Sequence, residues 1–342
     1  PRLLFAIGKH HRILEKEGWR ILTPRHAPEE SLAGHLTFAL KYEGLDLAVL
    51  KRLFETIGPE PIEAMVRDKP TSIYARRLWF LCEWLTGATL NLPDATAGRY
   101  VKILDPKLQI ATPGELVQRQ RVRNNLPGTP AFCPLINRSQ AIDAFLAKNL
   151  QGRAQTLVAQ MPQDLLARTA AFLLLNDSKS TFAIEGENPP QDRIQRWSRA
   201  VIQAGSRPID QGELLRLQQI VIGDTRFVHL GYRQAGGFVG ERDRQTHLPI
   251  PEHISARPKD LSSLVDGMID FARHYGPSLD PVLAASLLAF GFVYVHPFED
   301  GNGRLHRYLI HHVLAEHHFS PAGIVFPISA AIFEEIGRYR MA

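Results

Sequence analysis

Apolar side chains recur at three- and four-residue steps along most of this chain, the spacing that gathers them on one face of a helix. The clearest early example runs from Ile73 to Leu85, and Gly87 follows where a helix cap would stand. This pattern predicts a helical region over residues 1–126. Further helices are predicted over 138–149, 163–184, 190–204, 211–222, 259–275, 281–295 and 303–317.

The interval 227–254 interrupts the helical pattern and is rich in glycine and proline. Val228–Tyr232 and Phe238–Val239 flank Gly236–Gly237, whose access to positive φ suits a tight hairpin turn. Leu248–Pro251 is expected to be extended, because a residue before proline is pushed away from helical angles. The predicted fold class is all-α (mainly α), a helical bundle with one small β-hairpin.

Proline and glycine cluster between Leu126 and Pro134, which is typical of a domain boundary. This cluster predicts an N-terminal region over 1–126, a linker over 127–137 and a second domain over 138–342. The patterning assigns no role to the N-terminal region.

The composition is that of a globular protein, with 44% apolar residues in a chain of 342. No stretch reaches the roughly 18 apolar residues that a bilayer span needs, and the first residues do not resemble a signal peptide. We therefore expect a cytoplasmic protein with no membrane partner. Cys82 and Cys133 have no CxxC neighbour and are expected to be buried, with neither a disulfide nor a zinc ribbon.

The net charge of +5 and the pI near 9.3 permit an anionic ligand, but charges of both signs are interspersed. The densest basic patch holds Arg119, Arg121 and Arg123. We interpret it as a solvated segment leading into the linker, so nucleic acid is not the expected partner.

A tight turn over 296–303 separates two buried helices. The segment before it is apolar nearly all round and ends where Pro297 forbids continuation. The turn feeds a helix N-terminus, where unpaired N–H groups and the glycines Gly301 and Gly303 can receive an anion. Arg304 and Arg307 lie on one face of that helix and suit several phosphoryl oxygens at once.

Two further side chains of this turn can take part in a reaction. Asp300 offers a hard oxygen ligand for Mg²⁺ beside the phosphate site. His296 is the side chain there whose ordinary pKa suits proton transfer near neutral pH, so it is the candidate base. Their coincidence within twelve residues indicates a functional site. Five downstream histidines do not have HExxH spacing and do not indicate zinc: His306, His311, His312, His317 and His318.

The run from His296 to Arg307 resembles the Fic signature, H-x-F-x-[D/E]-G-N-G-R-x-x-R, at every specified position. Doc-type kinases tend to have A-N-K where this chain has Gly301–Asn302–Gly303, so the resemblance is to the AMP-transferring branch. It implies a Fic-type helical bundle with a β-hairpin flap. It makes His296 the base for a target hydroxyl and Asp300 the Mg²⁺ ligand.

The same resemblance assigns the phosphates. Asn302 and the flanking Gly301 and Gly303 would cradle the α- and β-phosphates, Arg304 would contact the β- and γ-phosphates, and Arg307 the γ-phosphate. The implied activity is that of a protein adenylyltransferase, which uses ATP and Mg²⁺ to place AMP on a Tyr, Thr or Ser hydroxyl of a target protein. The target is unnamed, and self-modification and a homodimer stay open.

Glu185 closes a helix predicted over 163–186, where its charge faces the negative end of the helix dipole and calls for a cationic partner. Thr181, Glu185 and Gly186 resemble the family's inhibitory motif, [S/T]-x-x-x-E-[G/N]. The resemblance implies that Glu185 pairs with Arg307 and blocks the γ-phosphate position. This predicts an autoinhibited enzyme of the class with an N-terminal inhibitory helix.

The interval from Gly231 to Pro251 resembles the family's flap, and Tyr232, Phe238 and Val239 would dock the target there. Where relatives often have an Asn near the adenine, this chain has Glu335 or a neighbour, a departure that bears on adenine selectivity. Two alternatives stay open. One is a hydrolase that removes AMP at the same site, and the other is a non-catalytic module that binds a partner or DNA.

Overall fold

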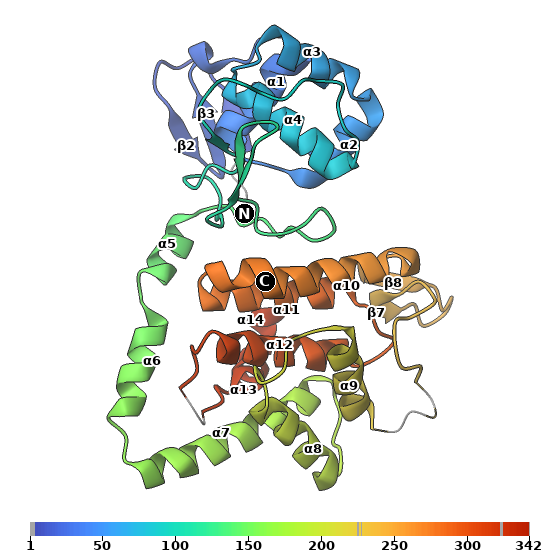
Figure 1. The fold of residues 1–342 in the computed structure, drawn as a ribbon. Helices are drawn as coiled ribbons and strands as arrows, with labels where there is room; N and C mark the ends of the chain where they lie inside the picture. Colours follow the sequence, from blue (N-terminus) through green and yellow to red (C-terminus); the bar gives the residue numbers. More distant parts are fainter. Residues whose placement is uncertain (1–3, 224–225, 227, 322–323, 342) are drawn as a thin grey trace. The chain divides into compact units, whose positions relative to one another are not determined.

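The computed structural model describes residues 4–223, 226, 228–321 and 324–341. The chain divides into two compact units (Figure 1). The first covers the chain up to Pro130 together with Leu135–Asp143, and the second holds Ala131–Pro134 and the chain from Ala144 onward. No helix among the described residues is both long enough and apolar enough to cross a bilayer.

Helix α4 is the centre of the first unit. Its residues Leu78, Trp79 and Leu81 are almost fully buried, and Gly87 caps it in the left-handed conformation, as predicted. The neighbouring helices pack on it because their apolar faces have the helical period. The helices of this unit are η1 (Pro24–His26), α1 (Leu32–Phe38), η2 (Ala39–Glu43), α2 (Leu47–Ile57), α3 (Glu60–Asp68) and α4 (Ile73–Thr86).

Two three-stranded sheets accompany these helices, so the prediction of a purely helical N-terminal region is wrong. One sheet has the order β1-β3-β2 and the other β4-β6-β5, and each combines a parallel with an antiparallel pair. The strands are two to four residues long, too short for alternation to identify them. They are β1 (Leu4–Ile7), β2 (Leu14–Lys16), β3 (Trp19–Leu22), β4 (Val101–Lys102), β5 (Glu115–Val117) and β6 (Val122–Asn124).

The arginine patch of this unit is structured and not a solvated segment. Arg119, in the turn between β5 and β6, forms ion pairs with Glu83 at 3.1 Å and with Asp94 at 2.7 Å. Arg121 and Arg123 donate to the carbonyls of Gly98 and Gly114.

The second unit is mainly helical, as predicted, and three of its helices have the predicted bounds: 163–184, 211–222 and 281–295. The short helix after Asn149 was not predicted. Helix α5 (Gln140–Leu146) begins in the first unit and ends in the second. The later helices are α6 (Leu150–Ala159), α7 (Gln163–Ile184), α8 (Gln191–Ile202), α9 (Gln211–Ile222), η3 (Pro258–Asp260), α10 (Leu261–Asp270), η4 (Phe271–Tyr275), η5 (Gly276–Ser278), α11 (Pro281–Val295), α12 (Asn302–Glu316), α13 (Ile328–Glu334) and α14 (Ile336–Met341).

Helix α12 runs through the middle of this unit and packs against α7, α8, α9, α11 and α13 (Figure 1). Leu305, Tyr308 and Leu309 on it are fully buried. A buried polar cluster fixes α7 to its neighbours. Asp177 accepts from the backbone N–H of Ser329 at 2.6 Å and lies 3.0 Å from Nε2 of His311. These contacts set the position of the last turns of α7.

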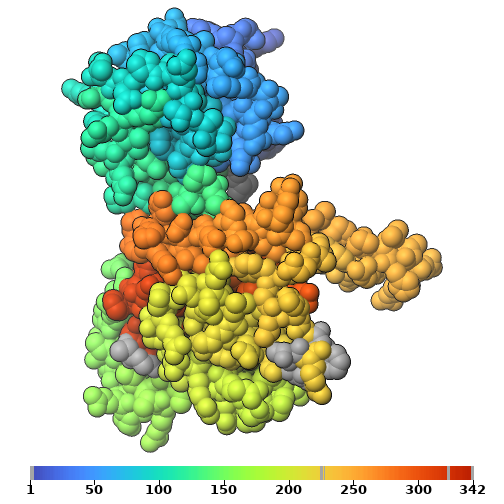
Figure 2. Space-filling model, turned by 45° about the vertical axis from the view of Figure 1, so that its right-hand side comes forward, coloured from blue at the N-terminus to red at the C-terminus, as the bar shows by residue number. Residues whose placement is uncertain are grey.

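The hairpin is present, but its turn is not at Gly236–Gly237. Strand β7 (Phe238–Arg242) pairs antiparallel with β8 (Pro249–Ile254), and the loop between them is held by Asp243, whose carboxylate accepts from the backbone of Gln245 and Thr246. The hairpin projects from the unit (Figure 2). The predicted strand Val228–Tyr232 is an irregular segment with one bridge, from Tyr232 to Phe298. Residue 227, where the predicted irregular interval begins, lies outside the described residues.

Candidate active site

The turn between α11 and α12 is held closed by Asn302. Its side-chain amide donates to the carbonyl of Phe298 at 2.8 Å and its oxygen accepts from the N–H of Phe298 at 3.1 Å. The Phe298 ring is fully buried and Asn302 is 2% exposed. The Asn302 side chain is therefore used inside the turn, and what faces outward is the backbone around it.

His296 caps α11 in the left-handed conformation, with φ 54°. Strain of this kind at a non-glycine residue is characteristic of functional sites. Its Nδ1 lies 3.3 Å from the carbonyl of Val293, and a carbonyl only accepts, so Nδ1 carries the proton and Nε2 keeps a lone pair. Burial lowers the pKa of His296, and the charge of Arg233 acts in the same direction. The neutral base is thus the favoured form near pH 7.

The N-terminus of α12 directly follows the turn. Gly301 precedes it in the left-handed conformation, with φ 94°, and by helical geometry the first N–H groups have no acceptor within the helix. A Cβ on Gly303 would clash with Oε1 of Glu185. The Glu185 carboxylate therefore occupies the space immediately beside this helix terminus.

Arg304 is 2% exposed and lies between two carboxylates. Its Nη2 donates to Asp300 at 2.9 Å and its Nη1 to Glu187. Glu187 is fixed from its other side by Arg193 at 2.6 Å, and both guanidiniums flank the ring of Phe182. Glu187 was not predicted as a site residue, although it lies two positions after Glu185.

Arg307 is 4% exposed and bound entirely by the end of α7. Its Nη2 donates to Oε1 of Glu185 and to the carbonyl of Thr181, each at 2.8 Å, and its Nε donates to Oγ1 of Thr181 at 2.8 Å. Burial lowers the pKa of Arg307, while Glu185 acts to raise it. The structure thus joins the predicted pair of Glu185 and Arg307.

The helix end that holds Glu185 is a Schellman motif. The N–H of Glu187 donates to the carbonyl of Phe182, and that of Gly186 to the carbonyl of Ala183, with Gly186 at φ 72°. This geometry reverses the chain directly after Glu185. It places the carboxylates of Glu185 and Glu187 on the two neighbouring arginines of α12.

Asp300 has the properties expected of a Mg²⁺ ligand. Half of its side chain is exposed, and one oxygen accepts from Arg304 and from the N–H of Gly301. A single hard carboxylate beside an anion site fits the way Mg²⁺ binds together with substrate phosphates. Among the described residues there is no group of three or more His, Cys, Asp or Glu side chains that could hold a metal by themselves.

The three predicted docking residues lie in two places. Tyr232 stacks on Phe298 at 5.9 Å with its hydroxyl buried, whereas Phe238 and Val239 are on β7. Between them Arg233, which is 4% exposed, donates from Nε to the carbonyl of His296 at 2.8 Å and also bonds to the carbonyls of Ala235 and Ala256. Arg233 ties the base of the hairpin to His296, a link with no sequence signal.

The structure also describes other residues that the sequence singled out. His306 bonds to the carbonyl of Ala289 and to Tyr339, and burial lowers its pKa to about 4. Glu335 is exposed and pairs with Arg338. Cys82 is buried as expected, but Cys133 is only half-buried.

Parts of the chain are similar to known proteins. The model of the Fic/DOC family matches residues 208–314, which include the turn and the hairpin. The chain is 28% identical over 136 residues to a protein adenylyltransferase Fic of Nematostella vectensis, covering 40% of this chain and 30% of that protein. The chain therefore spans less than a third of that relative. A crystal structure of a Fic family protein from Desulfovibrio desulfuricans aligns with a TM-score of 0.44 and 21% identity, covering 60% of this chain and 66% of that one.

The chain covers a larger share of a second, shorter relative. The chain is 32% identical over 113 residues to a Fido domain-containing protein of Dictyostelium discoideum, covering 32% of this chain and 69% of that protein. With the family model matching the same turn and helices, the chain belongs to the Fic/DOC family.

Proposed function

We propose that this chain is a protein adenylyltransferase that moves AMP from ATP to a Ser, Thr or Tyr hydroxyl of a target protein, and that its resting state is autoinhibited. One observation carries the proposal. A single turn brings a base, His296, next to a helix N-terminus and two buried arginines, and the carboxylates on those arginines come from the end of another helix.

The reaction follows from these groups. The target hydroxyl oxygen attacks the α-phosphorus, its proton passes to Nε2 of His296, and the bond to the leaving pyrophosphate breaks. The N–H groups that open α12, together with Arg304 and Arg307, bind the phosphate oxygens. Asp300 would hold Mg²⁺, which supplies neutralisation of phosphate charge when bound.

Glu185 is the proposed brake. Its oxygen lies close enough to Gly303 to clash with a Cβ there, so it fills the place through which a phosphate would approach the helix terminus. It also accepts a hydrogen bond from Nη2 of Arg307, a donor that a phosphate would otherwise use. A carboxylate and a phosphate are both anions, so they compete for the Arg307 guanidinium and repel each other at contact distance. ATP can therefore place its phosphates here for the reaction only after Glu185 has moved away.

Target docking is assigned to the hairpin. A two-stranded sheet leaves unpaired backbone groups along its edges, and an extended target segment can add to such an edge. Phe238 and Val239 on β7 would contact its side chains. This mode depends on the target backbone, so either another protein or a second copy of this chain fits it.

The test separates AMP transfer from phosphate transfer. Glu185→Gly is incubated with lysate proteins and ATP labelled at either the α- or the γ-phosphate, and Glu185→Gly/His296→Ala is the control. Label from the α-phosphate alone, lost in the control, is expected. Incorporation from the γ-phosphate would refute AMP transfer. Release of AMP from a modified target by the unaltered chain, abolished by Glu185→Gly, would support the hydrolase instead.

A further inference from the structure

A strongly basic hollow lies in the first unit, between the start of α4 and the loop that contains β4. Its volume is about 520 Å³, within the usual range for small-molecule sites. Its charged lining consists of five cations and one carboxylate: Lys41, Arg76, Arg77, Arg99 and Lys102, against Asp105. Such an imbalance in a concave site concentrates positive potential and attracts anions.

Arg77 is the unusual member of this lining because it is buried and, among the described residues, forms no ion pair with a carboxylate. It is 5% exposed, and its Nη2 and Nη1 donate to the carbonyls of Ile103 at 2.6 Å and of Leu40 at 3.4 Å. Its Nε is buried and has no hydrogen-bond partner. Burial lowers the pKa of Arg77 to about 10. Its guanidinium also lies over the Tyr74 ring, 6.0 Å from the centroid, and the charge of Asp105 acts on it only from a distance. Arg77 therefore lacks the direct ion pair that a buried guanidinium normally has.

Arg76 repeats the arrangement one position earlier. It is 1% exposed, its Nη1 donates to the carbonyls of Arg99 and Arg121, and its Nε is also buried without a partner. In the part of the chain that the structure describes, neither of these two arginines forms an ion pair. Two adjacent buried cations at one hollow are an arrangement that an added anion would stabilise.

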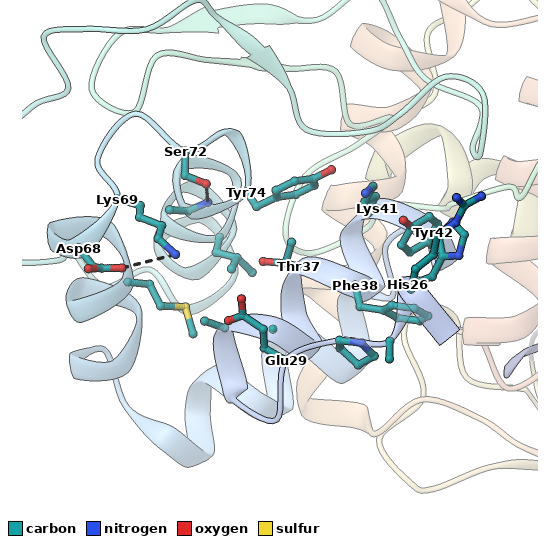
Figure 3. Close-up of a pocket in the computed structure, with 18 residues that line it drawn as sticks. His26, Glu29, Thr37, Phe38, Lys41, Tyr42, Asp68, Lys69, Ser72 and Tyr74 are labelled. Carbon is teal, nitrogen blue, oxygen red and sulfur yellow. Dashed lines mark hydrogen bonds and ion pairs between the residues drawn. The ribbon is translucent and has the colours of Figure 1, made fainter. Parts of the chain in front are cut away.

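Aromatic rings stand beside the cations. Tyr74 and Tyr100 line the hollow, and the guanidinium of Arg121 lies 5.0 Å from the Tyr100 ring centroid. Tyr74 and Lys41 also line a neighbouring hollow of about 400 Å³, where Tyr74 reaches from α4 toward Lys41 (Figure 3). Planar rings next to guanidinium and ammonium groups suit a ligand that carries both a phosphate and a flat base.

We propose that this hollow is a phosphate-binding site for nucleotide chemistry, separate from the turn on α12. The phosphate contacts Arg77, Arg99 and Lys102, and a base stacks on Tyr74 or Tyr100. Guanidinium forks favour phosphate, whose several oxygens accept from more than one of them. The phosphate could belong to a free nucleotide or to a nucleic-acid strand, and the experiment separates these sources.

The experiment compares two double variants of equal charge change. Arg99→Gln/Lys102→Gln removes two of the three exposed cations of the hollow and leaves Lys41, and Lys51→Gln/Arg52→Gln on α2 removes two exposed cations outside it. Binding of thymidine monophosphate, a short fluorescent thymidine oligonucleotide and unphosphorylated thymidine is measured at low and high salt, with circular dichroism to check folding. ATP is not used, because the second unit would bind it.

We expect a phosphorylated probe to bind the unaltered chain, to weaken about tenfold or more in Arg99→Gln/Lys102→Gln and to be unaffected by Lys51→Gln/Arg52→Gln. Binding should fall with salt. Binding of the mononucleotide identifies a free nucleotide as the ligand, and binding of the oligonucleotide alone identifies a strand. Equal loss in both variants, equal binding of thymidine, or no binding of either phosphorylated probe would overturn the proposal.

Discussion

Arg307 donates from Nη2 to Oε1 of Glu185 at 2.8 Å across 122 sequence positions, and two residues beyond Glu185 the carboxylate of Glu187 binds Arg304 in the same way. Both contacts come from the Schellman end of α7. The two arginines proposed to bind phosphate are thus neutralised by one short segment. A movement of that segment would free both.

Glu187→Gln should therefore increase nucleotide affinity once Glu185 is gone. In the Glu185→Gly background we expect ATP to bind about tenfold more tightly, because Arg304 loses a charged competitor. Isothermal titration calorimetry measures this. Asp192→Asn, which removes a carboxylate paired with Arg196 on α8, is the control and should have no effect. Weaker ATP binding in Glu187→Gln would instead mean that Glu187 holds Arg304 ready for the phosphate.

Gly303→Ala should weaken ATP binding in the Glu185→Gly background. The added Cβ enters the space that the Glu185 oxygen now occupies, and a phosphate needs the same space. We expect a loss of about tenfold. The matched control is Gly212→Ala, at the same position of α9, where a Cβ would make only an ordinary contact at 3.4 Å with Asp210. Equal losses in both variants would contradict the assignment.

The activity of Glu185→Gly should depend on pH through His296. The base must be neutral, and burial lowers the pKa of His296 from its ordinary value of 6.5. The rate should therefore fall as the pH drops and the ring becomes protonated, with a midpoint below 6.5. A pH–rate profile at saturating ATP tests this. A midpoint well above 6.5 would show that another group limits the reaction.

Arg233→Met should reduce turnover without changing ATP affinity. Arg233 donates to the carbonyls of His296 and Ala256, so it fixes the turn to the base of the hairpin. Neither carbonyl belongs to Arg304 or Arg307, the two arginines proposed to bind phosphate. We expect turnover to fall by about tenfold to a hundredfold, as when a reacting group is misplaced. Arg199→Met, which removes an exposed arginine of α8, is the control. A parallel loss of ATP affinity in Arg233→Met would indicate general unfolding.

The sequence predicted the elements that depend on local pattern. Helix α11 was predicted to the residue because a proline opens it and Pro297 forbids its continuation beyond the cap residue His296. The turn was predicted because helical spacing of apolar residues resumes only from Leu305. The strands of the first unit were missed because they are two to four residues long. The hairpin turn was misplaced because Asp243 supplies the loop's hydrogen bonds in place of Gly236–Gly237.

The pattern of residue types along the chain could not predict which side chains meet after folding. Arg233 and Glu187 have no signature, since their roles come from carbonyls and an arginine brought close by folding. The buried Arg76 and Arg77 belong to an ordinary helical pattern, and only the structure reveals that neither has a carboxylate partner among the described residues. Glu185 was singled out because an acid at a helix C-terminus is poorly placed for its own helix, but its pairing with Arg307 was implied only by the family resemblance.

The proposed brake is tested most directly by the initial rate at which label from α-phosphate-labelled ATP enters protein, compared between the unaltered chain and Glu185→Gly at equal concentration. If Glu185 holds Arg307 away from the nucleotide, Glu185→Gly should incorporate label at least about tenfold faster, and adding His296→Ala should abolish the gain. Equal rates in the unaltered chain and Glu185→Gly would contradict the account.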